Sequence, residues 1–342
     1  KENTMQLGLL MFPSPTGSAG LARMAEQLGF NSLVFADTQC VTPEVWGQLM
    51  LAAAATEHIE IGTGVTNPVS RDPAVTASAA LGLQVESGGR AVLGIGRGDS
   101  SMAKIGRRPV PPADFELYLE KLRSYLDGKE VMRNGSPSRI EWLDDIEVPS
   151  VPIEVAATGP KVIDIAARRA DRISFAVGAD IERLGACIAR ARTTAEAAGR
   201  DPSALRFGAF INCVIHENPA IAREAIRGGL SVFAHFSGFK GMEIDALPEG
   251  VREAALHLGE NYDMANHALS TGAHAQALKA DFIHRFGIAG PVEEAVSRFE
   301  EIRDTGIDFV RVIPGSRDMD LGIGFPSLQA LATQVLPAVA VD

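Results

Sequence analysis

The chain has 342 residues and a formal net charge of −11, with 46% hydrophobic and 22% charged residues. This composition is ordinary for a soluble globular protein. The acidic balance, without any cluster of Lys or Arg, argues against a nucleic-acid binder, whose surface must neutralise phosphates. No apolar run reaches the roughly 20 residues that span a bilayer, and the first ten residues are too short and polar for a signal peptide. We therefore expect a cytoplasmic protein that has no membrane partner.

The first third of the chain alternates short apolar runs with longer segments of helical periodicity. Leu21, Met24, Ala25 and Leu28 form a stripe at helical spacing that stops at Gly29. The runs that predict strands are residues 6–12, 32–36, 60–63 and 91–95. The segments that predict further helices are 45–56 and 73–87.

The middle of the chain interrupts this alternation and then resumes it. Residues 107–112 hold three prolines and predict a loop. A helix is expected at 115–127, and the polar stretch 128–151 is interpreted as an irregular surface excursion. Further strands are predicted at 153–157, 172–175 and 206–214, and further helices at 161–170, 181–198 and 219–236.

The strand–helix rhythm is lost between residues 237 and 281, which we interpret as a helical insertion. His235, His257, His267 and His274 lie just before or inside it. Near neutral pH such side chains can carry protons, although a given surface histidine is more often idle. After the insertion we expect a helix from 292 to 302, a closing strand at 309–312 and a final helix that carries the apolar residues of 328–336.

Eight strands in this order predict one (β/α)₈ TIM barrel that occupies residues 1–342 and has a helical insertion at 237–281. Barrels of this type run from about 200 to over 400 residues as one unit. An open doubly wound sheet also has alternating elements, but it carries a glycine-rich phosphate turn after its first strand. The corresponding turn here, residues 13–17, reads Pro-Ser-Pro-Thr-Gly. We therefore favour the barrel.

The active site of such a barrel is built from the loops that follow the carboxyl ends of the strands. This rule selects a small set of positions before any family is considered. They are Asp37, Thr38 and Gln39; Gly64, Val65, Thr66, Asn67 and Pro68; Gly96, Arg97, Gly98, Asp99 and Ser100; Thr158, Gly159, Pro160 and Lys161; and Val177 and Gly178.

In two of these loops the residue types themselves indicate binding of a ring or of an anion. The glycines of residues 94–98 allow a flat ring or a phosphate to approach the backbone, although a plain glycine turn with solvated Arg97 and Asp99 remains an alternative. Thr158 to Lys161 open a helix whose free N–H groups attract anions, although simple capping explains them as well. The scattered cysteines, Cys40, Cys187 and Cys213, predict neither a disulfide framework nor a zinc site. No metal-binding or serine-hydrolase motif is present.

Several segments together resemble the luciferase-like flavin oxidoreductases, and most of all their deazaflavin-dependent branch, the methylenetetrahydromethanopterin reductases. The resemblance lies in residues 61–68 (IGTGVTNP), 71–74 (RDPA), 87–96 (SGGRAVLGIG) and 157–161 (ATGPK). It continues through Phe282, Phe286, Ile288, Gly290, Gly306 and Pro314-Gly315, and it is weakest in the insertion.

The resemblance implies a set of roles. It places a non-proline cis peptide, which backs the cofactor ring, at Gly64–Val65. It places Asp37 by the polar edge of the ring and Asp99 near the reactive face, where Asp99 or Thr38 would assist a proton transfer. Thr66 and the 96–98 loop would border the ring. Residues 158–161, with Val177 and Gly178, would hold the cofactor phosphate. Relatives form dimers, so we expect a homodimer through the helix at 45–55.

Two departures from the family pattern leave the identity of the cofactor undecided. Many relatives have histidine where this chain has Thr38, and the reductase branch often has proline where this chain has Arg97, a position at which several FMN monooxygenases have arginine. The first hypothesis is an oxidoreductase that moves a hydride between reduced coenzyme F420, a deazaflavin, and a small organic substrate. The alternatives are a two-component FMN monooxygenase that uses reduced flavin and O₂, and a cofactor-binding protein without catalytic activity.

Overall fold

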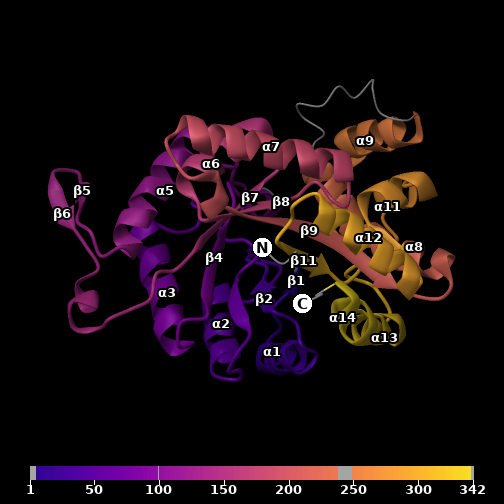
Figure 1. Ribbon diagram of the computed structural model, residues 1–342, viewed down its shortest axis with the longest axis horizontal. Helices are drawn as coiled ribbons and strands as arrows, with labels where there is room; N and C mark the ends of the chain where they lie inside the picture. The colour runs from indigo at the N-terminus through magenta and orange to yellow at the C-terminus, as the bar shows by residue number, and fades with distance from the viewer. Residues whose placement is uncertain (1–4, 99, 238–248, 340–342) are drawn as a thin grey trace.

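Eight parallel strands form a closed barrel in the computed structural model, which describes residues 5–98, 100–237 and 249–339 (Figure 1). Strand β11 pairs with both β9 and β1 and closes the ring. The predicted barrel and the positions of its eight strands, to within one residue, are confirmed. The strands are β1 (Gln6–Met11), β2 (Ser32–Phe35), β3 (Glu60–Thr63), β4 (Ala91–Ile95), β7 (Ile153–Ala157), β8 (Arg172–Phe175), β9 (Arg206–Ile215) and β11 (Phe309–Ile313).

Helices cover the outside of the barrel, and several of them begin at a side chain that caps the first turn. Asp72 accepts a hydrogen bond from the Ala74 N–H, and Pro73 occupies the first turn of α3 (Pro73–Glu86). Asp180 caps α7 (Ile181–Ala197) through the Arg183 N–H. The other covering helices are α1 (Ser18–Gln27), α2 (Val45–Ala53), α5 (Pro112–Leu126), α6 (Pro160–Arg169), α8 (Pro219–Ser237), α12 (Val292–Asp304), α13 (Leu321–Ala330) and α14 (Leu336–Val339).

The apolar face of α2 is buried within the chain itself. Trp46, Leu49 and Ala53 are at most 7% exposed, and only Leu51 lies half exposed on the outer side. The helix thus packs as an ordinary barrel helix, and the expected homodimer through this region stays a prediction. Among the described residues, no helix combines the length and the apolar character that crossing a bilayer requires.

The described part of the insertion contains helices, joined by turns and coil at residues 262–272. It contains α9 (Glu249–Asn261) and α10 (Ala273–Gln276), and α11 (Ala280–Phe286) follows at its end; residues 238–248 lie outside the described part. These helices pack on α8 beside the barrel, at the right in Figure 1. Leu230, Leu258, Leu278 and Phe282 form the centre of a second apolar cluster that holds the insertion in place.

Three elements were missed or misread in the sequence. The stretch interpreted as irregular contains a hairpin of β5 (Val131–Arg133) and β6 (Ser136–Ser138), whose Asn134 and Gly135 both have positive φ, as two-residue Asn-Gly turns require. Strand β10 (Ile288–Gly290) pairs with the end of β9 before α12 begins. A short helix, α4 (Ser100–Lys104), follows the glycine loop. These segments of three to five residues are too short for periodicity to reveal.

The amino-terminal end of the barrel is closed by a buried ion network. The Arg311 guanidinium, 1% exposed, lies 2.6 Å from Glu154 Oε2 and 3.1 Å from Glu60 Oε1, and it also donates to Ser32 Oγ. Arg172 binds both carboxylate oxygens of Glu60 at 2.7 Å. Burial disfavours the charge of Glu60, but the two guanidinium groups outweigh it and hold the Glu60 pKa below its usual value.

Candidate functional site

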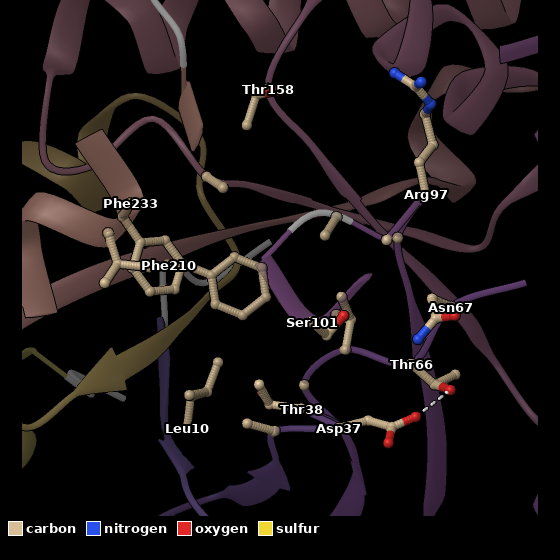
Figure 2. A pocket seen from close by; sticks show the side chains of 18 of the residues that line it. Leu10, Asp37, Thr38, Thr66, Asn67, Arg97, Ser101, Thr158, Phe210 and Phe233 are labelled. Atoms are coloured by element: carbon tan, nitrogen blue, oxygen red, sulfur yellow. Dashed lines mark hydrogen bonds between the residues drawn. The ribbon is translucent and has the colours of Figure 1, made fainter. Parts of the chain in front are cut away.

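A cavity lies at the opposite, carboxyl end of the barrel strands (Figure 2). It collects side chains from the ends of β1, β2, β3, β4, β7, β8 and β9 and from α8, as expected for this fold. Its described lining consists of Leu10, Phe12, Ala36, Asp37, Thr38, Gly64, Val65, Thr66, Asn67, Gly96, Arg97, Gly98, Ser101, Ala156, Thr158, Val162, Ala176, Phe210, Val232, Phe233 and His267. Of the predicted site residues that the structure describes, those after strands β2, β3 and β4 therefore meet here, together with Thr158.

The segment after β3 forms one wall of the cavity with its backbone. The Gly64–Val65 peptide bond is cis, which confirms the position predicted for it. Gly64 donates to Phe35 O at 2.7 Å, and Thr66 donates to Gly94 O at 2.9 Å, so the segment is held between β2 and β4. A Cβ on Gly64 would stand 2.5 Å from Val34 Cγ2, and one on Gly94 would stand 2.0 Å from Thr63 O. Glycine is therefore required at both positions by close packing.

Asp37 lies in this wall as part of a charged network rather than as an isolated carboxylate. Its Oδ2 accepts from Thr66 Oγ1 at 2.7 Å and from the Arg71 guanidinium, and its Oδ1 accepts from Gln39 Nε2 at 2.7 Å. Arg71 also binds Glu44 Oε1 at 2.7 Å. Burial disfavours the charge of Arg71, but the Asp37 and Glu44 carboxylates outweigh it and raise the Arg71 pKa. The Asp37 carboxylate is thus fixed in direction by three donors.

Asn67 supplies a hydrogen-bond donor that no described protein atom satisfies. Its Oδ1 accepts from the backbone N–H groups of Val69 and Ser70 at 3.0 and 2.9 Å, which fixes the orientation of the amide. Its Nδ2 is buried and has no partner in the described part of the chain. Since leaving a buried donor unpaired costs free energy, this atom indicates a ligand acceptor in the cavity. The loop rule selected Asn67 at this strand end, although no binding or catalytic role was assigned to it.

The loop after β4 borders the cavity on its other side. Gly96, Arg97 and Gly98 line it, together with Ser101 of α4. The Arg97 side chain is tied by a 2.7 Å hydrogen bond from its Nε to Val110 O, while Val110 N donates back to Arg97 O. Arg97 therefore fixes the proline-rich loop. The predicted catalytic Asp99 lies outside the described residues.

The predicted phosphate loop is only partly at the cavity. Thr158 lines it, and α6 begins at Pro160 with Gly159 at its N-cap and Lys161 exposed. The helix start thus presents N–H groups and one positive charge beside Thr158.

Val177 and Gly178 differ from the expectation for them. Val177 has no exposed surface, and Gly178, at φ +68°, is buried against Phe286, whose carbonyl oxygen a Cβ there would meet at 2.4 Å. Neither residue is in the described lining. The two are buried because Ala179 N donates to Phe286 O and fastens this loop to the helix α11.

The remaining lining is apolar apart from the Thr38 hydroxyl and one imidazole. Leu10, Phe210 and Phe233 lie together in Figure 2, and the two phenyl rings are 5.8 Å apart. His267, which comes from the insertion, is 5% exposed and lines the same cavity. The cavity therefore has a polar side at Asp37 and Asn67 and an apolar side with a single histidine. Leu10, Phe210, Phe233 and His267 were not predicted as cofactor or catalytic groups, although His267 was noted among the four insertion histidines.

Comparisons with known proteins agree with this arrangement. The model of the luciferase-like monooxygenase family matches residues 4–308. The chain is 27% identical to a 5,10-methylenetetrahydromethanopterin reductase of Methanolobus tindarius over 306 residues, 87% of this chain and 89% of the relative. It is 28% identical to the enzyme of the same name from Archaeoglobus fulgidus over 309 residues, 86% of this chain and 87% of that one.

Solved structures share the fold over nearly the whole chain. The coenzyme F420 dependent tetrahydromethanopterin reductase from Methanopyrus kandleri superposes with a TM-score of 0.74 at 22% identity, covering 98% of this chain and 99% of the other. An F420-dependent secondary alcohol dehydrogenase gives 0.72 at 20% identity with the same coverage. The monooxygenase RslO1 from Streptomyces bottropensis gives 0.68 at 21% identity, covering 97% of this chain and 99% of that one.

Proposed function

The chain belongs to the luciferase-like monooxygenase family and is an oxidoreductase, and we propose that it transfers a hydride between the deazaflavin coenzyme F420 and a small organic substrate. Reductases that are 27–28% identical over most of the chain support the reductive chemistry. The names of the two most similar of these solved structures, both F420-dependent, support a deazaflavin over FMN.

The unpaired amide of Asn67 is the observation that carries this proposal. A flavin or deazaflavin ring is flat and has carbonyl oxygens along one polar edge, and Asn67 Nδ2 offers the donor that such an edge accepts. Gly64, which lines the cavity, has no side chain of its own that would prevent a flat ring from approaching its backbone. The residues present therefore fit the cofactor that the family uses.

Each side of the cavity then has a distinct task. Asn67 and the Asp37 network orient the polar edge of the ring, and the start of α6 with Thr158 and Lys161 attracts the cofactor phosphate. Phe210 and Phe233 exclude water from the space in which the substrate meets the ring. When bound in its reduced form, the cofactor supplies the hydride, and the protein contributes orientation and a dry environment.

The FMN monooxygenase is the second candidate because the matching family model is that of luciferase-like monooxygenases and the monooxygenase RslO1 shares the fold. In the sequence, Arg97 was the feature that favoured it. In the structure this arginine binds Val110 O and thereby holds the 107–111 loop, so its presence has an explanation that does not depend on the cofactor. It therefore gives FMN no particular support.

A titration of the purified protein with F420 and with FMN tests the proposal. We expect micromolar binding of F420, followed by its absorbance and fluorescence, and FMN binding at least tenfold weaker, a difference of about 1.4 kcal/mol. Micromolar affinity for FMN with no F420 binding, together with O₂ uptake when reduced FMN is supplied, would contradict it. Binding of neither cofactor would contradict both candidates.

A further inference from the structure

Helix α8 supplies two side chains, Val232 and Phe233, to the apolar side of the cavity. The centroid of the Phe233 ring lies 5.8 Å from that of Phe210 on β9, and Leu10 of β1 lies beside the pair (Figure 2). Phe210 and Leu10 belong to barrel strands, whereas Val232 and Phe233 come from a covering helix. The position of this part of the wall therefore depends on how closely α8 packs on the strands.

The register between α8 and β9 shows where this distance is set. Gly229 precedes Phe233 by four residues, so both lie on the same face of the helix, about 6 Å apart along its axis. On β9, Phe210 and Asn212 likewise share one face of the strand. Phe233 meets Phe210. One turn away, a Cβ on Gly229 would stand only 2.8 Å from Asn212 Nδ2. The closest contact between α8 and β9 thus lies directly beside the aromatic pair.

At Gly228 and Gly229 the helix is too close to two loops to carry a side chain. A Cβ on Gly229 would stand 2.6 Å from Gly315 O, in the loop after β11. One on Gly228 would stand 2.4 Å from Ala268 O, in the insertion. Cβ atoms do not approach other atoms this closely. Because glycine is a poor helix former, two in succession inside a 19-residue helix indicate that packing requires them here.

Ser316 fastens α8 at the same point. Its Oγ donates to Ala225 O at 2.7 Å and accepts from the Gly228 N–H at 2.9 Å. Its own N–H also donates to Ala225 O, at 2.8 Å. Ser316 is buried, so these bonds join the loop after β11 to the turn of α8 that precedes Gly229. We call Gly228, Gly229 and Ser316 the α8 seat.

We propose that the α8 seat determines the size of the apolar group that the cavity accepts from a substrate. Phe233 is the side chain that limits this size, and Gly229 and Ser316 are positioning residues that act through it. The side chains of this wall, those of Leu10, Phe210, Val232 and Phe233, carry no polar atom, so the group that they select is a hydrocarbon one. The inference goes beyond the proposed function, because it holds for either ring cofactor.

Fluorine NMR of the cofactor-free protein, labelled with 4-fluorophenylalanine, tests the proposal with toluene and 2-methylnaphthalene as probes. The variant Phe233→Leu assigns the Phe233 signal, which we expect toluene to shift in a saturable way. Gly229→Ala should push α8 outward, since its Cβ has no room. The dissociation constant of 2-methylnaphthalene should then fall about tenfold relative to that of toluene. Gly185→Ala, at a helical glycine of α7 whose added Cβ meets nothing within 4 Å, is the matched control and should leave the ratio unchanged.

Ser316→Ala is the milder variant, and it decides the outcome if Gly229→Ala does not fold. It should change the ratio in the same direction by about threefold. Ser231→Ala, which removes a hydroxyl bonded to Gly228 O within α8 itself, should not change it. An unchanged ratio in Ser316→Ala or in a folded Gly229→Ala would overturn the proposal, as would a Phe233 signal that neither probe shifts. A protein that gives the expected ratios but does not bind F420 would contradict the proposed function alone.

Discussion

The two ends of the barrel interior are formed by the same eight strands but differ in whether their polar groups are paired within the protein. At the amino-terminal end, Arg311, Glu154, Glu60 and Arg172 fill the space with charges that pair with one another. At the carboxyl end, small residues leave a cavity, and Asn67 Nδ2 has no partner in the described chain. A polar group that is satisfied by its neighbours stabilises the fold, whereas one left unsatisfied at the edge of a cavity indicates a ligand.

This difference predicts that changes at the two ends separate stability from binding. Changes in the network at the amino-terminal end should alter unfolding and leave the affinity of the intact protein for its cofactor nearly unchanged. Changes in the cavity lining should lower the affinity for the cofactor and leave unfolding nearly unchanged.

The largest effect is expected for Arg311→Met. Removing the guanidinium leaves Glu154 buried without its main counter-charge, which should destabilise the chain by about 3–5 kcal/mol. Urea unfolding followed by circular dichroism measures this loss, and F420 affinity well below the unfolding transition should be retained. The double variant Arg311→Met/Glu154→Leu should recover most of the lost stability. A loss smaller than about 1 kcal/mol in the single variant would mean that the network contributes no more than surface ion pairs do.

Acid should weaken the same network. The pKa of Glu60 is lowered in the folded chain, so its contribution to stability is complete above its usual value of 4.5 and is lost as the pH falls through the lowered value. We expect the free energy of unfolding in urea to fall less between pH 5 and pH 3 in Glu60→Gln than in the unaltered protein. Equal losses of unfolding free energy in both proteins would show that the pKa of Glu60 is not lowered in the folded chain.

At the cavity, Asn67→Asp removes the unpaired donor. The substitution keeps an oxygen that accepts from the Val69 and Ser70 N–H groups and replaces the NH₂ with a carboxylate oxygen, which accepts but does not donate. We expect F420 affinity to fall about 10- to 100-fold, or about 1.4–3 kcal/mol, with little change in unfolding. Asn218→Asp, which has a comparable backbone contact at Ala220 away from the cavity, is the matched control. An unchanged affinity would remove Asn67 from the site.

The smallest effect is expected for Lys161→Gln at the start of α6. An exposed charge at a helix terminus contributes about 0.3–1 kcal/mol, so F420 affinity should fall only two- to fivefold at low salt, and the difference should shrink as salt is added. Lys129→Gln, at another exposed lysine, should not change the affinity. Equal affinities of Lys161→Gln and the unaltered protein at low salt would place the cofactor phosphate elsewhere.

The sequence predicted the strands of the barrel better than the residues at its mouth. Runs such as 91–95 and 153–157 are apolar and bounded by turn residues, so their positions follow from composition alone. The cis bond at Gly64–Val65 followed from the family resemblance. The polar network at the amino-terminal end was not foreseen, because the single charges of Glu154 and Arg311 lie inside apolar runs and their pairing joins strands 157 residues apart.

The cavity residues that were missed have equally physical reasons. Phe210 lies in β9, where nine of the ten residues are buried, so no alternation marks its inward face. His267 lies in an insertion without periodicity and reaches the cavity only through the turn at Ala268. The burial of Gly178 depends on its contact with Phe286, which is distant in the sequence.

A crystal structure of the protein with F420 bound tests the central claim most directly. The account predicts a deazaflavin ring that lies on the Gly64–Val65 backbone, with Asn67 Nδ2 within about 2.7–3.2 Å of a ring oxygen or nitrogen and the phosphate near Thr158. A ring bound outside this cavity, or one inside it with Asn67 Nδ2 still unpaired, would contradict the account.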